Sequence, residues 1–352
     1  MTAVGDWLAP APARPAPSEP RISGLVALVA VLGGVLPILV MAVTWATRPQ
    51  PVRRESSCAD GSGYVVADRP GEKRYEPAVQ CNAAGAANRV ERAGTGRYRV
   101  TFGGIGRDGG LAEITPVTGD DRICTLPEWR PRGHDEQVEV TCFDRAGAAA
   151  DSGFAVRYRY RGEGALAYLR LGDPGRNSQT IDDPYSHNSA RGGVNSADRE
   201  DIGSYVVYFG RQEGVSGGAA QVVAVGEAPA VCGVQRWSAY PDGRALAVRV
   251  RCRDGAGQPL DSRFAVSFAG AGHVVADRPA QARYAPAAGT VVTRIAVGRW
   301  RVQTPGRTGS VQVTAYDSAA VCVVGSISDL RIVCRGTSGK PVDTRFVLTT
   351  WR

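Results

Sequence analysis

Two kinds of hydrophobic pattern divide the chain. Residues 22–47 form an uncharged run of 26 residues between Arg21 and Arg48, whereas hydrophobic residues elsewhere occur in short segments separated by turns that contain Gly and Pro. Many short segments alternate hydrophobic and polar residues, as in RYRVTF at 97–102. Alternation with a period of two is typical of β-strands that have one face in a core and the other in water. The pattern predicts an all-β protein, with tandem antiparallel β-sandwich or barrel-like domains after one N-terminal transmembrane helix.

The strand segments recur in three similar copies. Four different residue types in the first copy recur 110 residues later and then again after a further 82 residues; they are Cys142, Gly147, Asp151 and Phe154. A constant offset across unlike residues indicates an internal repeat. We therefore expect a polar Pro/Ala-rich tail at 1–21, a transmembrane helix at 22–47, a linker at 48–62, and β repeats at 63–161 (repeat 1), 162–269 (repeat 2) and 270–352 (repeat 3).

The middle repeat differs from the others in its first part. Repeats 1 and 3 share the sequence VVADRP, at 65–70 and 274–279, whereas repeat 2 has a segment rich in Asn, Ser, Asp, Gly and Arg at 172–201. We interpret this segment as a polar insertion. Long loops on a rigid β scaffold often carry recognition, so a specific partner is expected to bind there. The alternative is a tolerated surface loop, because lengthening a loop costs little closure entropy.

The run at 22–47 is long enough to cross a bilayer, which requires about 20 apolar residues. Trp45 lies where an interfacial anchor is expected. A cleaved signal peptide is the alternative, although hydrophobic regions of signal peptides are usually shorter. The flanking arginines alone would place the C-terminal side in the cytoplasm. We expect the opposite orientation, because cysteine pairs belong outside the cytoplasm.

The eight cysteines fall into local pairs, and the last three pairs occupy matching places in the repeats. We expect four disulfides in an oxidising compartment, namely Cys58–Cys81, Cys124–Cys142, Cys232–Cys252 and Cys322–Cys334. A zinc site would need tighter spacing and more nearby histidines than the three in the chain. No metal ligands are therefore expected.

The order of features in the repeats resembles a functionally uncharacterised repeat of secreted and membrane-anchored bacterial proteins. In repeat 1 the matching residues are Tyr75, Pro77, Gly96, Tyr98, Val100, Phe102, Cys124, Trp129, Val140, Cys142, Gly147, Asp151, Ser152 and Phe154. The resemblance covers most of 63–352 and implies a fold and a location rather than an activity. Repeat 3 departs from the pattern, with Ile327 in the tryptophan place and Thr344 in the serine place.

Candidate chemistry is sparse. The glycines at 104, 106 and 109 have dinucleotide-binding spacing, but a β-like segment follows instead of the required helix, so no cofactor is expected. Trp129 and Trp237 each follow a cysteine by five residues, and we favour a core position over an exposed binding position. A secreted hydrolase remains the alternative function, with His187 and the acids Asp182, Asp183 or Glu200 in the 172–201 segment. A paired-carboxylate mechanism requires two acids positioned in a cleft.

The net charge of +8, with 42 Lys and Arg residues, would suit anionic polymers or lipid headgroups. The arginines are scattered along the sequence, so a compositional bias is the simpler interpretation. Basic and aromatic residues do not alternate along one face, and nucleic acid is not expected as a partner. The preferred function is a non-enzymatic binding or structural module at the cell envelope, membrane-anchored, with an envelope polymer, glycan or protein as partner.

Overall fold

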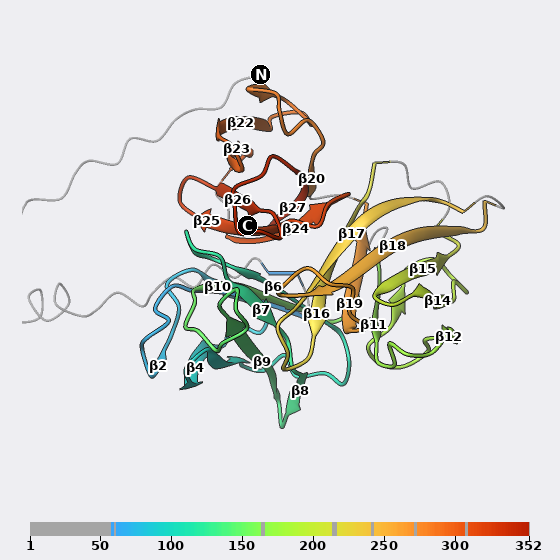
Figure 1. Cartoon of the computed structure of the whole chain (residues 1–352). Helices are drawn as coiled ribbons and strands as arrows, with labels where there is room; N and C mark the ends of the chain where they lie inside the picture. Colours follow the sequence, from blue (N-terminus) through green and yellow to red (C-terminus); the bar gives the residue numbers. More distant parts are fainter. Residues whose placement is uncertain are drawn as a thin grey trace, which may run out of the picture. The chain divides into compact units, whose positions relative to one another are not determined.

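The computed structural model describes residues 58–59, 61–162, 166–212, 217–240, 243–270, 273–306 and 309–351. Its secondary structure in these ranges consists of β-strands, arranged in several antiparallel sheets, so the all-β prediction is confirmed (Figure 1). The expected tail, the expected transmembrane helix and the linker up to residue 57 lie outside the described residues. Within the described ranges, no helix is long and apolar enough to cross a membrane. Residues 54–352 form one compact unit.

Repeat 1 contains two sheets that face each other across a hydrophobic core. We call the sheet that meets the other repeats the inner sheet. It has the order β3-β1-β10-β6 and consists of β1 (Ser62–Ala67), β3 (Gln80–Asn82), β6 (Leu111–Pro116) and β10 (Phe154–Arg159). The outer sheet has the order β2-β4-β5-β9-β7, with β8 also paired to β9. Its strands are β2 (Arg74–Tyr75), β4 (Asn88–Gly94), β5 (Arg97–Phe102), β7 (Ile123–Thr125), β8 (Trp129–Arg132) and β9 (Asp135–Phe143).

Repeat 2 follows the same plan. Its inner sheet consists of β11 (Leu166–Leu171), β13 (His187–Asn188), β16 (Ala219–Val225) and β19 (Arg263–Ala269). Its outer strands are β12 (Ser178–Thr180), β14 (Asn195–Asp201), β15 (Ser204–Gly210), β17 (Ala230–Ala239) and β18 (Ala245–Asp254).

Repeat 3 has fewer described strands. Its inner strands are β20 (His273–Ala276), β24 (Ser310–Tyr316) and β27 (Arg345–Trp351). Its outer strands are β21 (Arg283–Tyr284), β22 (Val291–Ala296), β23 (Arg299–Gln303), β25 (Val321–Ser326) and β26 (Arg331–Arg335).

The segment 172–201 corresponds to repeat 1 strand for strand. Strand β12 pairs with β14, as β2 pairs with β4. Strand β13 pairs with β11, as β3 pairs with β1. Strand β14 pairs with β15, as β4 pairs with β5. The Pro174 carbonyl accepts a hydrogen bond from the Tyr205 hydroxyl at 3.2 Å, as the Pro70 carbonyl does from Tyr98 at 3.2 Å. The segment is therefore a variant of the same strands rather than an insertion. Its edge strands are short and polar, so their side chains do not show the alternating pattern.

Aromatic pairs mark the same place in each core. A ring from the third outer strand packs on a phenylalanine of the inner sheet, with ring centroids 5.1 to 5.3 Å apart; the pairs are Tyr98–Phe154, Tyr205–Phe264 and Trp300–Phe346. All six side chains are fully buried. Burying large aromatic rings contributes much of the stability of such cores.

The repeats contact one another through three equivalent junctions. Each junction is a parallel β-bridge between two residues of different repeats. One residue lies at the end of an inner strand or directly after it. The other lies two positions after a cysteine. The bridges are Val117–Val324, Val225–Leu126 and Tyr316–Val234. The residue after each inner-strand residue donates its backbone N–H to the carbonyl of the bridge partner in the other repeat. These hydrogen bonds run from Thr118 to Val324 at 2.8 Å, from Gly226 to Leu126 at 3.0 Å and from Asp317 to Val234 at 2.8 Å. Because these junctions join each repeat to both others, they close a ring.

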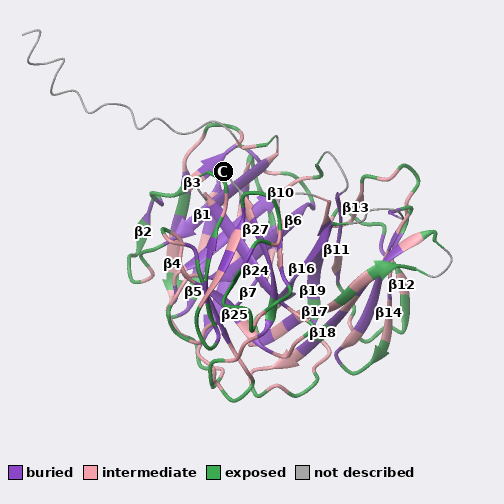
Figure 2. Cartoon of the chain, turned by 90° about the horizontal axis from the view of Figure 1, so that it is seen from above, coloured by how far each residue is buried: buried purple, intermediate pink, exposed green. Residues whose placement is uncertain are grey.

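A buried polar layer lies where the inner sheets meet. Its central residues occupy one equivalent position in β6, β16 and β24: Glu113, Gln221 and Gln312. The Gln312 amide donates to the Ala155 carbonyl of repeat 1 at 3.1 Å, and the Gln221 amide donates to the Val347 carbonyl of repeat 3 at 3.2 Å. Glu113 accepts the Ser267 hydroxyl of repeat 2 at 2.8 Å. Figure 2 shows these inner strands largely buried.

Candidate functional site

Two clefts open beside the junctions of the ring. The repeat 1–2 cleft has a volume of about 670 Å³, and the repeat 2–3 cleft has a volume of about 480 Å³. Each is lined by the outer sheet of one repeat and by residues of the next, which include Arg170 and Arg263 in the first cleft and Tyr316 and Asp317 in the second. Residues 139–141 of β9 line the first cleft and residues 249–251 of β18 line the second. These positions are equivalent, because they are related by the 110-residue repeat offset.

Charged side chains of both signs line the repeat 1–2 cleft. The cations are Arg97 and Arg99 of repeat 1 with Arg170 and Arg263 of repeat 2. The anions are Glu128, Glu139 and Glu227. The repeat 2–3 cleft is lined by Arg236, Arg249 and Arg251 with Glu200 and Asp317. Arginine therefore outnumbers the acids in both clefts.

Strand geometry places the arginines on one face. Arg97 and Arg99 alternate along β5 with Tyr98 and Val100, which are buried in the core of repeat 1. Residues two apart on a strand point to the same side, so the two arginines share the outer face. The same Arg-x-Arg spacing occurs at 249–251 on β18 and at 299–301 on β23. Each outer sheet thus presents an arginine pair.

Within each Arg-x-Arg pair of the described chain, one arginine is in an ion pair and the other is not. Arg99 Nε lies 2.8 Å from Glu139, and that hydrogen bond raises the pKa of Arg99. Arg249 pairs with Glu200, and Arg301 Nη2 lies 3.5 Å from Asp329. Among the described residues, no ion-pair partner contacts Arg97, Arg236, Arg251, Arg263 or Arg299. Their positive charges remain available to a ligand.

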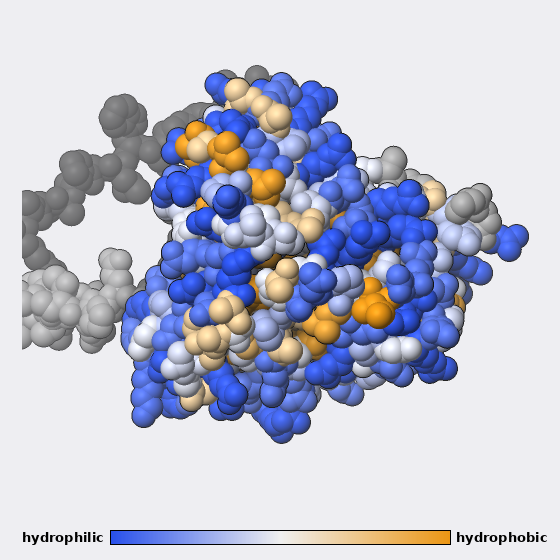
Figure 3. All heavy atoms as spheres, in the orientation of Figure 1, coloured by the Kyte–Doolittle hydropathy of each residue, from blue (hydrophilic) through white to orange (hydrophobic). Residues whose placement is uncertain are grey.

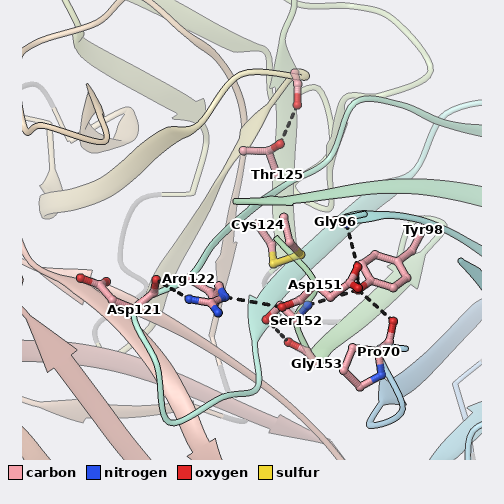
Figure 4. The surroundings of a disulfide bond; sticks show 12 residues. Pro70, Gly96, Tyr98, Asp121, Arg122, Cys124, Thr125, Asp151, Ser152 and Gly153 are labelled. Atoms are coloured by element: carbon pink, nitrogen blue, oxygen red, sulfur yellow. Dashed lines mark hydrogen bonds between the residues drawn. A yellow bond between two sulfur atoms is a disulfide. The ribbon is translucent and has the colours of Figure 1, made fainter. Parts of the chain in front are cut away.

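A repeated aspartate supports the hairpin that carries Arg97. The Asp151 carboxylate accepts hydrogen bonds from the Gly96 N–H at 2.8 Å and the Tyr98 hydroxyl at 2.9 Å (Figure 4). It also accepts hydrogen bonds from two nitrogens of Arg92. Burial alone would raise the pKa of Asp151, but these hydrogen bonds outweigh it and lower the pKa. Gly96 has a φ of 67°, and a side chain there would collide with the Cys142 carbonyl. The cluster therefore fixes the backbone immediately before Arg97.

The cluster recurs in the other repeats with one change. Asp261 binds Arg199, the Gly203 N–H and the Tyr205 hydroxyl, and Asp343 binds Arg294 and the Gly298 N–H. In repeat 3, Trp300 replaces the tyrosine. Its indole N–H donates to the Pro279 carbonyl at 3.3 Å, as the Tyr98 hydroxyl donates to the Pro70 carbonyl. The hydrogen bond from Tyr98 to the aspartate has no counterpart at Trp300 among the contacts of the described residues.

Both tryptophans of the cysteine hairpins lie at contacts between repeats. Trp129 is fully buried, as the core interpretation expected, and its ring lies edge-on to Tyr185 of repeat 2 at 5.5 Å. Arg170 packs against Tyr185, with its Cζ atom 3.2 Å from the ring centroid, so this arginine is held at the wall of the repeat 1–2 cleft. Trp237 is half-buried and packs on Tyr316 of repeat 3, with ring centroids 4.7 Å apart.

The eight cysteines are joined as Cys58–Cys81, Cys124–Cys142, Cys232–Cys252 and Cys322–Cys334. The last three join directly opposed residues of paired strands. They enclose loops with sequence separations of 18, 20 and 12 residues. Such cross-links restrict the unfolded chain and stabilise the fold by about 3 kcal/mol each in the chain-entropy model.

The structure does not bring His187 together with the acids of the hydrolase hypothesis. His187 packs against Tyr168 at 5.5 Å between ring centroids. Burial and the nearby Arg161 lower its pKa. Asp182 and Asp183 are exposed, and Glu200 pairs with Arg249 in the repeat 2–3 cleft. Within the described ranges, no group of His, Cys, Asp and Glu side chains could hold a metal ion.

His187 instead occupies the place of Cys81. The two residues pair with Tyr168 and Tyr64, which are equivalent positions of β11 and β1. A hydrogen bond joins His187 to the backbone of Gly162, near the start of repeat 2, where Cys58 bonds Cys81 in repeat 1. The histidine is therefore best explained as a structural contact.

No protein-family model, curated protein or solved structure matches this chain. The candidate site consequently depends on the geometry of the clefts. Sequence reasoning missed their arginines, which lie far apart in the chain and gather only after folding. The Arg-x-Arg spacing on an outer strand of each repeat was the signal that could have found them.

Proposed function

We propose that the protein is a non-enzymatic binding module, anchored in the cell membrane by residues 22–47 with its β repeats on the extracytoplasmic side. The observation that carries the binding role is the pair of equivalent arginine-lined clefts at successive junctions. Four disulfides are compatible with an oxidising compartment outside the cytoplasm. The uncharged length of residues 22–47 supports the anchor.

Repetition of the cleft favours binding over catalysis. Two similar sites on one rigid chain raise the effective concentration of a ligand that carries many copies of the same group. Polymers of the cell envelope have that property. The ring also suits this role, because its junctions hold the two clefts in a fixed relation within residues 54–352.

Co-sedimentation tests the binding role. Full-length protein in detergent is mixed with insoluble envelope material and centrifuged, and the bound fraction is measured in the pellet. We expect saturable sedimentation that is lost when the protein is reduced and denatured beforehand. Recovery of all the native protein in the supernatant would contradict a binding function at the envelope.

Protease treatment of intact cells tests the topology. External protease should remove the repeats and leave a short N-terminal fragment in the membrane fraction. If the repeats were protected in intact cells and digested only after lysis, the proposed orientation would be wrong. Recovery of the intact repeats in the medium would indicate cleavage within or after residues 22–47 and would contradict the anchor.

A further inference from the structure

We propose that the ligand of the clefts is an acidic polysaccharide, whose carboxylate or phosphate groups bind Arg97, Arg170 and Arg263. This inference rests on the proposed binding function and adds the chemical class of the ligand. It depends on three features of the repeat 1–2 cleft: its unpaired arginines, its glutamates and a lining that includes none of the large hydrophobic side chains exposed in the described ranges.

The unpaired arginines make the cleft suitable for anions. Arg97 and Arg263 come from opposite walls, are exposed, and contact no acid among the described residues. Arg170 lies in the same lining, with its guanidinium held against Tyr185. A guanidinium presents a planar set of donors that matches carboxylate and phosphate groups. An acid group in the cleft can therefore be contacted from both repeats.

The glutamates restrict which anion fits. Glu128, Glu139 and Glu227 line the same cleft, and each ionised carboxylate accepts hydrogen bonds but repels other anions. A densely charged polymer such as polyphosphate would place negative groups against these acids. A sugar chain places hydroxyl donors between its acid groups. The hydroxyls of such a chain can donate hydrogen bonds to the glutamates, and its acid groups can bind the arginines. Both kinds of side chain in the cleft then have a partner.

The lining argues against a protein partner. Protein interfaces usually centre on buried aromatic or apolar anchors, with charged residues at the rim. None of the large hydrophobic side chains exposed in the described ranges lines either cleft. Figure 3 shows a face on which hydrophilic residues predominate and hydrophobic residues form small, separate groups. A hydrated polymer suits such a surface better than a second folded protein.

The experiment uses full-length protein in detergent and measures binding to four immobilised polymers. Polygalacturonate supplies carboxylates, phosphomannan supplies phosphates, dextran is neutral, and poly-L-glutamate is an acidic peptide. The double variant Arg97→Gln/Arg263→Gln removes two cleft charges. Arg283→Gln is the matched control, because Arg283 is exposed on β21 and belongs to neither cleft lining. The melting temperature and the disulfide map of each variant verify that it folds.

We expect binding to polygalacturonate or phosphomannan, and the stronger of the two identifies the acid group. Binding to dextran should be at least about tenfold weaker. Each lost arginine contact should weaken binding about tenfold, so the double variant should lose about 100-fold. The Arg283→Gln protein should stay within about twofold of the original chain. Binding should also fall steeply as salt is raised.

Other results overturn the inference in distinguishable ways. Equal binding to dextran, or an unchanged double variant, would reject the anionic ligand and leave the proposed binding function standing. Equal binding to poly-L-glutamate with the same variant effect would reject the polysaccharide assignment. Sedimentation with envelope material but no binding to either acidic polysaccharide would reject this inference alone. Failure in both experiments would reject the proposed function as well.

Discussion

Replacing Asp261 with Asn should destabilise the protein measurably, although the change is nearly isosteric. The carboxylate accepts the Gly203 N–H at 2.8 Å, the Tyr205 hydroxyl at 2.8 Å and Arg199 Nη2 at 2.7 Å. These contacts, with the Arg199 hydrogen bond first, lower the pKa of Asp261 from 3.8 to about 2. One pKa unit corresponds to about 1.4 kcal/mol, and the carboxylate is partly screened by solvent. We therefore expect a loss of about 2 kcal/mol at pH 7.

The sign of the pH dependence follows from the direction of that shift. A carboxylate with a lowered folded pKa contributes its full stability above the unfolded pKa, near 3.8. The contribution is lost as the pH falls from about 4 towards about 2, because the folded state must then accept a proton. The difference in stability between the Asp261→Asn variant and the original chain should therefore be full at pH 7 and shrink below about pH 4.

Urea-induced unfolding under oxidising conditions, followed by tryptophan fluorescence, measures both effects. Asp343→Asn is the matched comparison, because Asp343 keeps the arginine and glycine contacts but has Trp300 in place of the tyrosine donor. We expect this variant to lose less stability than Asp261→Asn. Equal unfolding midpoints for Asp261→Asn and the original chain at pH 7 would refute the reasoning. A difference that persists at full size near pH 2 would refute the linkage to ionisation.

Three further changes test the ring and its buried charges. Gly109→Ala should cost about 2 kcal/mol or more in thermal melts, because Gly109 has a φ of 92° and its new methyl would collide with the Pro184 carbonyl; Gly119→Ala, in open space, should be nearly neutral. Gln221→Leu should cost about 2–3 kcal/mol in urea unfolding, because it leaves buried partners in repeat 3 without hydrogen bonds, and an unchanged midpoint would contradict the polar layer. Burial raises the pKa of Glu136 to about 8, so stability should fall as pH rises from about 4.5 to 8, and Glu136→Gln should abolish that component of the pH profile.

The strands and disulfides could be predicted because their signals are local. The alternation in RYRVTF corresponds to β5, in which Tyr98, Val100 and Phe102 are buried. The last three cysteine pairs needed only the repeat offset, since each joins opposed residues of one strand pair in its own repeat. Neither inference required knowledge of how the repeats meet.

The junctions and clefts could not be predicted, because they join residues distant in sequence. Gln221 looks like an ordinary polar residue within a strand, yet its amide crosses to Val347 in repeat 3. The 172–201 segment resembles an insertion in the sequence because repeat 2 lacks the VVADRP sequence and has a run of polar residues there. The arginines looked scattered because Arg97 and Arg263 meet only when repeats 1 and 2 pack together.

Arginine-specific labelling tests most directly whether the clefts are the binding surface. Full-length protein is treated with phenylglyoxal in the presence and absence of the acidic polysaccharide that binds most strongly, and each modified arginine is quantified by peptide mass spectrometry. We predict that saturating polysaccharide protects Arg97 and Arg263 in the repeat 1–2 cleft and Arg251 in the repeat 2–3 cleft, while Arg283 is labelled equally in both samples. Equal labelling of the cleft arginines with polysaccharide bound, or protection centred on Arg283, would contradict the account.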